Sequence, residues 1–536
     1  METALGRTSS IFKRMIDMRS AGSGLLRARR VFSLVPGSEG DCVWWLNGRI
    51  QGVGLAAELD RAVPRQVPRF ELPDALITPG LTDGHTHLGM WAVNRRRVQL
   101  AGVRTQEEVL ARIASAEPDQ GWILGQGWDA NGWSSPPDRF ALDRVQSGPV
   151  YLDSIDVHSA WLNSAALAAA GINRKTPDPF GGRIVRDASG DPSGLLLERA
   201  VELVTPYLPD TPVELLTEAL AGAQTAAHRL GITGVHVMES MATLAAFQRL
   251  DAAGELRLRV LFHPPVAALP TLIQRGVRSG QGSTWLSLGG VKMFLDGSLG
   301  SRTAWMLEPY TGSRDRGMPI TSESQARDAM VAAAAAGISS TVHAIGDAAV
   351  RRALDLMSGL PILPIPHRIE HFQCVHPADI GRAAGGIVVS MQPAHLLTDI
   401  HLVERHWGER GEGAYAFRSL LQHGARLAFG SDVPVASMDP RVGIHAAMER
   451  RGFDGAPAGG WRPEEKLSFS EALGAYTLGA AYAAGATHRR GLLAPGFDAD
   501  LVAWSVDSSA ENGDGEAFRQ GHAVLTIVGG QVVMRV

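Results

Sequence analysis

Cysteine is scarce in this chain of 536 residues, which contains only Cys42 and Cys374. Two cysteines so far apart in the sequence do not build a disulfide framework or a cysteine-based metal motif. Long apolar runs are also missing, since no stretch approaches the roughly 18 residues of a membrane span. The first segment, METALGRTSSIFKRMIDMRSAGSG, lacks the apolar core of a secretory signal. We therefore expect a cytoplasmic protein with no membrane partner.

The chain also lacks an excess of basic residues, because its formal net charge is -4 at pH 7. Nucleic-acid binding depends on clustered Lys and Arg that neutralise phosphates, so we expect no nucleic-acid partner and a small-molecule substrate instead. The hydrophobic fraction of 45% and the charged fraction of 20% are those of a globular protein. The length allows a large barrel with additions.

Both ends of the chain resemble short antiparallel strands broken by Gly and Pro. Residues 29–78 include RRVFSLVPGSEGDCVWWLNGRIQGVG, and residues 488–536 include GLLAPGFDADLVAW and HAVLTIVGGQVVMRV. Because chain termini often lie close together, we expect these ends to form one small composite β-sandwich. Residues 1–28 are predicted to be a tail.

Between the two ends, strand-like runs alternate with Ala-rich helical stretches such as QARDAMVAAAAAG. The predicted strands lie in DALITPGLTDGHTHL, GITGVHVM, LRLRVLFHPP, LGGVKMFLDGS, ISSTVHAIGD, PHRIEHFQCV, GGIVVSMQP and ARLAFGSDVPV. This alternation predicts an α/β fold, a (β/α)8 TIM barrel over residues 79–487. Residues 95–212 depart from the rhythm and are predicted to form an insertion over the barrel mouth.

Residues able to bind metals recur towards the ends of the predicted strands. His85 and His87 share one face because alternate residues of a strand point the same way, although such a pair also arises by chance. The further candidates at later strand ends are Lys292, His343, His371 and Asp432. In such a barrel the carboxyl ends of the strands form the active-site face, so all these residues are predicted to meet at one rim.

An ordered series of motifs resembles the amidohydrolase superfamily, in the branch that contains N-substituted formamide deformylase. The motifs are PGLTDGHTHL, GQGWD, DVHSAWLNSAAL, VKMFLDGSLGSRTA, VHAIGDAAV, HRIEH, SMQPAHLLTD and GSDVPV. The resemblance implies a binuclear metal centre on a (β/α)8 barrel. It places His85 and His87 on the first metal, with Asp432 beside it, His343 and His371 on the second metal, and Lys292 between them as a carboxylated lysine.

The chemistry of Lys292 is consistent with that assignment. An unmodified lysine is a cation at neutral pH, and a dication about 4 Å away would repel it by about 8 kcal/mol at an effective dielectric constant of 20. The side chain must therefore be neutral, displaced or carboxylated, and a carbamate derived from CO2 would supply a bridging ligand. Imidazole and oxygen ligands suit Zn²⁺, and Fe, Mn, Co or Ni also accept them.

The resemblance implies two divalent metal ions that hold one water and lower its pKa towards about 7. Asp432 is then predicted to take the proton of the attacking hydroxide and return it to the leaving nitrogen. The predicted activity is that of a metal-dependent amidohydrolase, which cleaves the C–N bond of a non-peptide amide of N-acyl or N-formyl type by metal-hydroxide attack.

Several residues are predicted to contact the substrate. His158 and Asp156 lie in DVHSAW, where the family usually has Asp-Gly-His, and Val157 replaces the more permissive glycine. Arg302 in GSRTA has a fork of donors suited to a carbonyl or carboxylate, with a surface ion pair as the alternative. Trp128 in GQGWD is predicted to line an aromatic wall of the mouth, although most tryptophans simply pack.

Other polar residues near strand ends are predicted to be structural. Spacing alone does not exclude His367 as a ligand, because it has the same strand parity as His371. The residues expected in a structural role are His367, His236, His263, Cys374 and Asp296, with Asp296 as a turn cap or a residue facing the site.

Two alternatives to the amidohydrolase prediction stay open. An esterase, lactonase or deaminase would use the same binuclear barrel, and a barrel that has lost its ligands can serve as a non-catalytic scaffold. Because every ligand position is filled here, we favour an enzyme. Relatives of this kind are often dimers, so a homodimer is an option, although no stretch of the sequence indicates an interface.

Overall fold

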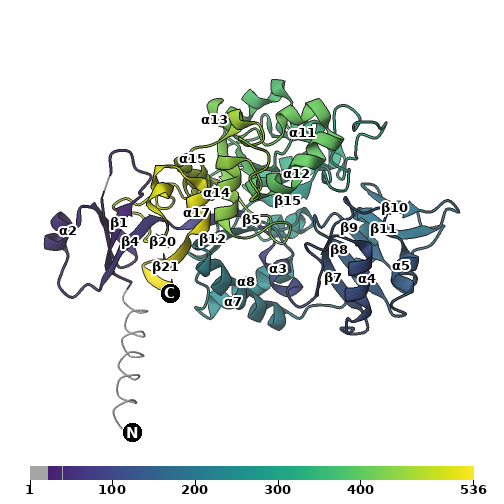
Figure 1. The fold of residues 1–536 in the computed structure, drawn as a ribbon, viewed down its shortest axis with the longest axis horizontal. Coiled ribbons are helices and arrows are strands. Elements are labelled where there is room, and N and C mark those ends of the chain that lie inside the picture. The colour runs from purple at the N-terminus through teal and green to yellow at the C-terminus, as the bar shows by residue number, and fades with distance from the viewer. Residues whose placement is uncertain (1–21, 39) are drawn as a thin grey trace, which may run out of the picture.

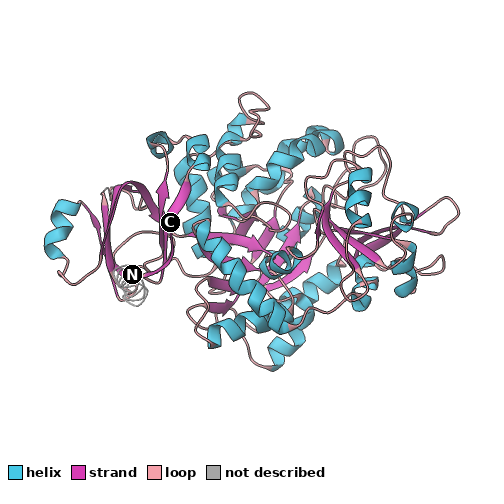
Figure 2. Ribbon diagram, turned by 60° about the horizontal axis from the view of Figure 1, so that its bottom comes forward, coloured by secondary structure: helices cyan, strands magenta, loops and turns pink. Residues whose placement is uncertain are grey.

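The computed structural model describes residues 22–38 and 40–536, and the strands in these ranges form four hydrogen-bonded sheets. Two parallel sheets surrounded by helices lie in the centre of the molecule (Figures 1 and 2). A sheet from both chain ends lies on one side of them, and an inserted sheet lies on the other. No helix in the described ranges is long and apolar enough to cross a membrane.

The first central sheet has the strand order β14 (Leu286–Leu288), β13 (Arg259–Phe262), β12 (Ile232–Val237) and β5 (Leu81–Thr86). The second has the order β15 (Val291–Phe294), β16 (Ser340–Ala344), β17 (Arg368–His371), β18 (Val388–Met391) and β19 (Arg426–Phe429). Every pairing is parallel. Each sequence segment predicted as a barrel strand contains one of these observed strands. The remaining strand, β14, is a short addition beside β13.

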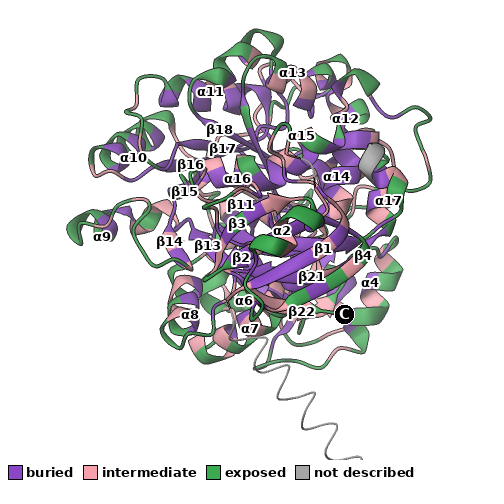
Figure 3. Cartoon of the chain, turned by 90° about the vertical axis from the view of Figure 1, so that its left-hand side faces the viewer, coloured by how far each residue is buried: buried purple, intermediate pink, exposed green. Residues whose placement is uncertain are grey.

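The central strands are buried on both faces, as expected for parallel sheets covered by helices. Figure 3 shows β15 to β18 enclosed by helices whose outer faces are exposed. The helices that accompany these strands are α3 (Leu88–Asn94), α7 (Val213–Arg229), α8 (Met241–Ala252), α9 (Leu269–Gln274), α10 (Glu323–Ala335), α11 (Asp347–Met357), α12 (Pro393–His406), α13 (Phe417–Gln422), α14 (Pro440–Glu449), α15 (Phe469–Gly474) and α16 (Ala480–Ala483).

Helix α10 illustrates how the sequence specifies these helices. Ser322 caps its first turn and forms a capping box with Gln325, so two free backbone N–H groups are satisfied. The helix is rich in Ala, which has the highest helix propensity, and it buries a stripe that includes Ala326, Met330 and Ala333. It therefore needs only small side chains to pack closely against the strands.

Two isolated parallel bridges link the two central sheets. Thr86 at the end of β5 forms a parallel bridge with Val433, which follows β19. Pro265, which follows β13, forms a parallel bridge with Lys292 in β15. Parallel strands with helices outside make this an α/β fold of TIM-barrel type, in agreement with the predicted class at that level.

Both chain ends contribute to one continuous sheet. Its strand order is β22 (Gln531–Arg535), β21 (His522–Val528), β20 (Leu501–Ser505), β4 (Arg69–Pro79), β1 (Gly24–Val31), β2 (Cys42–Leu46) and β3 (Arg49–Gly54). The long strand β4 joins the two ends, because it pairs in parallel with β1 and antiparallel with β20. The helices α2 (Ala56–Ala62) and α17 (Gly515–Gln520) also belong to these ends of the chain.

The predicted tail, residues 1–28, overlaps strand β1, which begins at Gly24. Residues 1–21 of that tail lie outside the described residues. The strand was missed because arginines interrupt its apolar pattern. In the folded chain Arg27 pairs with Asp60 and Glu71, so its charge is neutralised by neighbouring elements while the leucines beside it are buried.

The irregular stretch predicted at 95–212 contains a sheet of its own. The strand order is β10 (Gly182–Arg186), β11 (Pro192–Glu198), β9 (Ser159–Leu162), β8 (Val150–Ser154), β7 (Ile123–Trp128) and β6 (Val98–Gln99). The helices α4 (Gln106–Ala114), α5 (Arg139–Asp143) and α6 (Ser164–Ala169) accompany it. Two apolar clusters lie within this unit, so it has its own core.

Candidate metal centre

One group of possible metal ligands consists of His85, His87 and Asp432, whose ligand atoms all lie within 4.8 Å of one another. Asp432 Oδ1 lies 3.2 Å from His85 Nε2 and 3.3 Å from His87 Nε2. The backbone fixes this arrangement, since the Asp432 N–H donates to the His85 carbonyl over 2.8 Å. The ends of β5 and β19 therefore bring the predicted His-x-His pair and the predicted aspartate together.

A second group consists of His371, His395 and the same Asp432, again with ligand atoms within 4.8 Å. His395 Nε2 lies 3.8 Å from Asp432 Oδ2. His395 belongs to the first turn of α12, which begins with Pro393 directly after β18. His395 was not among the predicted ligands, although Pro at the first helical position after a predicted strand places the following residues at the rim.

His343 and Lys292 complete the predicted set. The His343 ring centroid lies 4.4 Å from that of His371, and Lys292 Nζ lies 4.7 Å from the Phe294 ring centroid. Burial lowers the pKa of Lys292 to about 8, although Glu370 and Asp432 favour its charged form. The lysine therefore sits among the imidazoles in a setting that favours its neutral amine.

Unpaired buried nitrogens gather at this site. Buried polar atoms normally have a hydrogen-bond partner, and a set without one points to a missing ligand. The buried atoms of the site without a partner are His85 Nε2, Lys292 Nζ, His343 Nδ1, His371 Nδ1 and His395 Nε2. Imidazole nitrogens next to a carboxylate suit a divalent cation such as Zn²⁺, so the donor set fits the metal that the sequence predicts.

The protonation states of the side chains also favour metal binding. Burial lowers the pKa values of His343 and His371 well below the usual range, so both rings are neutral and keep a lone pair. His343 Nε2 faces the Gly297 carbonyl at 3.1 Å, which leaves Nδ1 as the free atom. Burial opposes ionisation of Asp432, but the neighbouring imidazole of His85 holds the pKa of its carboxyl well below the usual range.

His158 reaches the site from the inserted unit. Its ring centroid lies 5.2 Å from that of His343, and its Nδ1 lies 2.8 Å from Glu198 Oε2. Burial disfavours the charged ring, but the Glu198 carboxylate raises the pKa of His158 to about 9. His158 is therefore a hydrogen-bond donor at the edge of the predicted ligands, and its partner Glu198 was not among the predicted site residues.

Asp156, predicted to contact the substrate, is held by three serine hydroxyls. Its carboxylate accepts hydrogen bonds from Ser154, from Ser298 at 2.6 Å and from Ser301 at 2.9 Å. The carboxylate oxygens of Asp156 therefore already accept hydrogen bonds from protein hydroxyls. Two of these bonds connect the inserted unit to the loop after β15. Val157 adopts φ of 59°, so this valine takes the left-handed backbone conformation that the usual glycine would adopt at lower cost.

The structure does not bring Trp128 to the predicted ligands. Its side chain packs against Trp133 and Trp161 in the core of the inserted unit, and its Nε1 donates to the Leu152 carbonyl. The last residue of β7 thus points into the sheet's own core. Arg302 lies exposed on the loop between β15 and α10, with φ of 54°.

The other histidines and polar residues have structural contacts. Asp296 accepts the backbone N–H groups of Ile345, Gly346 and Trp305, which lie outside the turn that it was predicted to cap. Its Oδ1 also lies 3.6 Å from His343 Nε2. His367 accepts the Ser340 N–H, as expected for a structural histidine. The residues His236, His263 and Cys374 are all buried.

A TIM-barrel-type fold with imidazoles and a shared carboxylate at its strand ends defines a class of enzyme built around a metal site. Residues 71–534 match the model of a family described as the amidohydrolase family. The chain therefore belongs to this family, which confirms the predicted superfamily and the predicted class, a hydrolase acting on carbon–nitrogen bonds.

Individual proteins that are similar to this chain agree with the family assignment. The chain is 35% identical over 489 residues to Protein LONG AFTER FAR-RED 3 of Arabidopsis thaliana, with 86% of this chain and 83% of that protein covered. It is 28% identical over 492 residues to N-substituted formamide deformylase of Arthrobacter pascens, covering 86% and 89%. The crystal structure of an uncharacterized metal-dependent hydrolase from Pyrococcus horikoshii superposes with a TM-score of 0.74 at 26% identity, covering 90% and 98%.

Proposed function

We propose that this protein is a metal-dependent amidohydrolase that cleaves the C–N bond of a small non-peptide amide of N-acyl or N-formyl type. The observation that supports this proposal most strongly is the position of Asp432, because its two carboxylate oxygens face two different groups of imidazoles. The similarity to N-substituted formamide deformylase supports the N-acyl or N-formyl class of substrate.

The proposal includes a single closed (β/α)8 barrel made from the two central sheets. The parallel bridges from Thr86 to Val433 and from Pro265 to Lys292 support it, since they link the two sheets in the parallel sense that closure requires. In such a barrel all the predicted ligands lie at one face, where the active sites of this fold occur.

The proposed centre holds two divalent cations, preferably Zn²⁺. His85 and His87 would bind the first cation, and His343 and His371 the second, with Asp432 beside the first. Lys292 would bridge the two as a carbamate, because its buried and unpartnered amine can attack CO2 and lose a proton in the process. When bound, such cations supply a water of lowered pKa, about 7, and a polarised carbonyl.

The protein side chains carry the proton and orient the substrate. Asp432 accepts the proton of the attacking water and delivers it to the leaving nitrogen, a transfer that contributes about 10²- to 10⁴-fold to the rate. His158 offers its Nε2 to the substrate carbonyl, since Glu198 already occupies Nδ1. A donor fixed in this way stabilises the negative charge that develops on the carbonyl oxygen.

Matched substrates test the reaction class. N-benzylformamide, benzyl formate and adenine would be incubated with the metal-loaded full-length protein, and a variant with both His85 and His87 replaced by Ala would serve as the control. We expect turnover of the formamide, which the control loses. Turnover of the ester alone or of adenine alone would replace this proposal with an esterase or a deaminase.

A further inference from the structure

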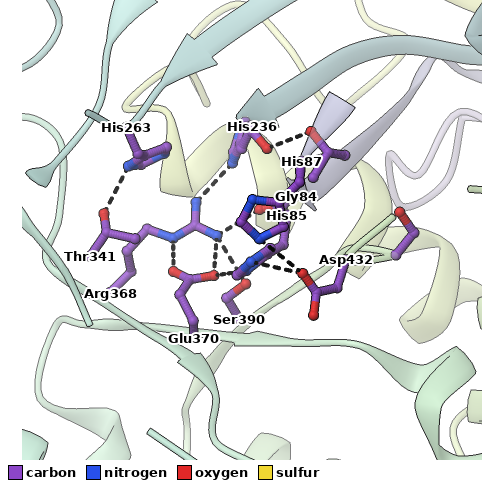
Figure 4. A network of polar contacts seen from close by, with 12 residues as sticks. Gly84, His85, His87, His236, His263, Thr341, Arg368, Glu370, Ser390 and Asp432 are labelled. Carbon is purple, nitrogen blue, oxygen red and sulfur yellow. Dashed lines mark hydrogen bonds and ion pairs between the residues drawn. The ribbon is translucent and has the colours of Figure 1, made fainter. Parts of the chain in front are cut away.

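A buried ion pair lies directly behind the candidate metal centre. Arg368 and Glu370 are two residues apart in β17, so their side chains point to the same side of the strand. Their side chains are 1% and 0% exposed, and Figure 4 shows them beside His85. A charged pair this deeply buried is costly, and stability alone would be served as well by apolar residues of similar volume.

Glu370 connects the pair to the predicted first metal ligand. Its Oε1 accepts from Arg368 Nε over 2.5 Å, and its Oε2 accepts from Arg368 Nη2 over 3.0 Å. The same Oε2 lies 2.6 Å from His85 Nδ1. Both oxygens of the carboxylate are therefore held in position, and one of them contacts the imidazole.

Arg368 is in turn fixed from several sides. Its Nη2 donates to the Gly84 carbonyl over 2.7 Å and to Ser390 Oγ over 2.9 Å. Its Nη1 donates to His236 Nδ1 over 2.8 Å, because a guanidinium has no acceptor. The partners come from β5, β12 and β18, so the guanidinium cannot turn away without losing contacts to three strands.

The contact between Glu370 and His85 determines which ring nitrogen of His85 carries the hydrogen. An ionised carboxylate only accepts hydrogen bonds, so Nδ1 must be the donor. In the neutral ring, Nε2 then has the free lone pair. This atom is buried and lies 3.2 Å from Asp432 Oδ1, yet it makes no hydrogen bond of acceptable geometry.

We propose that Arg368 and Glu370 are positioning residues that hold His85 in the Nδ1–H tautomer and thereby raise the affinity of the centre for its first metal ion. The inference rests on the proposed function, because it assumes that His85 binds a metal. A hydrogen-bonded carboxylate behind a ligand histidine fixes the ring and makes it more basic, and loss of such a partner typically lowers metal affinity 10- to 100-fold.

The variant E370Q tests this inference, with E465Q as the matched control. Glu465 is also buried and accepts from the Ser419 N–H over 3.0 Å, but it contacts none of the predicted ligands. The Zn²⁺ affinity of each full-length protein would be measured by competition with a chromogenic chelator. We expect a loss of about 10- to 100-fold in E370Q and wild-type affinity in E465Q.

A second measurement does not depend on metal or activity. Histidine labelled with ¹⁵N in the metal-free wild-type protein reports the tautomer of each ring, and the variant H85Q identifies the signals of His85. We expect Nδ1–H for His85 in the wild type and loss of that preference in E370Q, because an amide can donate as well as accept.

The outcomes separate the two proposals. Wild-type Zn²⁺ affinity in E370Q would overturn the positioning role and leave the proposed function intact, and a wild-type protein that binds no metal would overturn both. If E370Q does not fold, the wild-type spectrum still decides, since a His85 ring that carries its hydrogen on Nε2 would overturn the inference.

Discussion

The two oxygens of Asp432 face two different histidines: Oδ1 lies 3.2 Å from His85 Nε2, and Oδ2 lies 3.8 Å from His395 Nε2. His85 belongs to the first predicted strand of the barrel, whereas His395 lies in the first turn of a helix that follows a later strand. One carboxylate therefore lies between residues that are far apart in the sequence. This relationship makes His395 part of the candidate site.

Replacing His395 by Ala should reduce turnover by about 10- to 100-fold, the usual effect of removing a partner of a metal-site residue. The first ligand group would stay intact, because His395 does not contribute to it. Steady-state kinetics and the metal content of the purified variant would separate loss of rate from loss of the cation. His401 lies exposed on the same helix, so H401A is the control. Equal activity in H395A and H401A would remove His395 from the site.

Asp432 itself should be essential for turnover. The variant D432N keeps the size of the side chain but cannot accept a proton, so kcat should fall at least about 100-fold at saturating metal. Asp439 lies a few residues further along the same segment and caps α14, which makes D439N a control with the same chemical change. A D432N protein with the kcat of D439N would exclude Asp432 as the proton-transferring residue.

Periodicity in the sequence predicts which residues face inwards only while the strand remains regular. His367 and His371 have the same parity, and parity alone does not choose between them. In the structure His371 adopts φ of 71° and Asp432 adopts φ of 58°, so the chain turns at both residues and alternation ends there. Such conformations are uncommon for residues other than glycine, so the sequence gives no local sign of them.

The missed residues of the site are those defined by contacts between distant segments. Glu370 lies within the quoted HRIEH motif, but its function depends on the distance to His85, which belongs to another strand. Trp128, predicted to line the mouth, packs inside the inserted unit's own core. The strand ends were predictable from local pattern, whereas partners on distant strands and the packing of the insertion were not.

Acid should destabilise the protein partly through His228, which lies on α7 and is not one of the predicted ligands. His228 is buried on α7, with Nε2 3.1 Å from the Arg257 carbonyl, and burial lowers its pKa to about 4. The unfolded chain binds the proton near pH 6.5 and the folded chain only near pH 4, so stability present above pH 6.5 is lost as the pH falls towards 4.

The loss that His228 contributes should reach about 3 kcal/mol in the free energy of unfolding. Urea unfolding of wild-type protein and of H228Q between pH 7 and about pH 4 measures it, and the variant should show a flatter pH dependence. The exposed His522 provides the control H522Q. Parallel pH curves for wild type and H228Q would contradict the prediction.

Carboxylation of Lys292 should be directly visible. Lys292 is 5% exposed, and burial lowers its pKa to about 8, so a substantial fraction of its amine is neutral and able to attack CO2 at pH 8. Protein loaded with Zn²⁺ in the presence of ¹³C-bicarbonate should therefore give a carbamate carbon signal in its ¹³C NMR spectrum. The variant K292R keeps the positive charge and should lack this signal, because a guanidinium remains protonated and does not form the carbamate. A wild-type spectrum without the signal, in a protein that still binds metal and turns over substrate, would show that the centre works with an unmodified lysine.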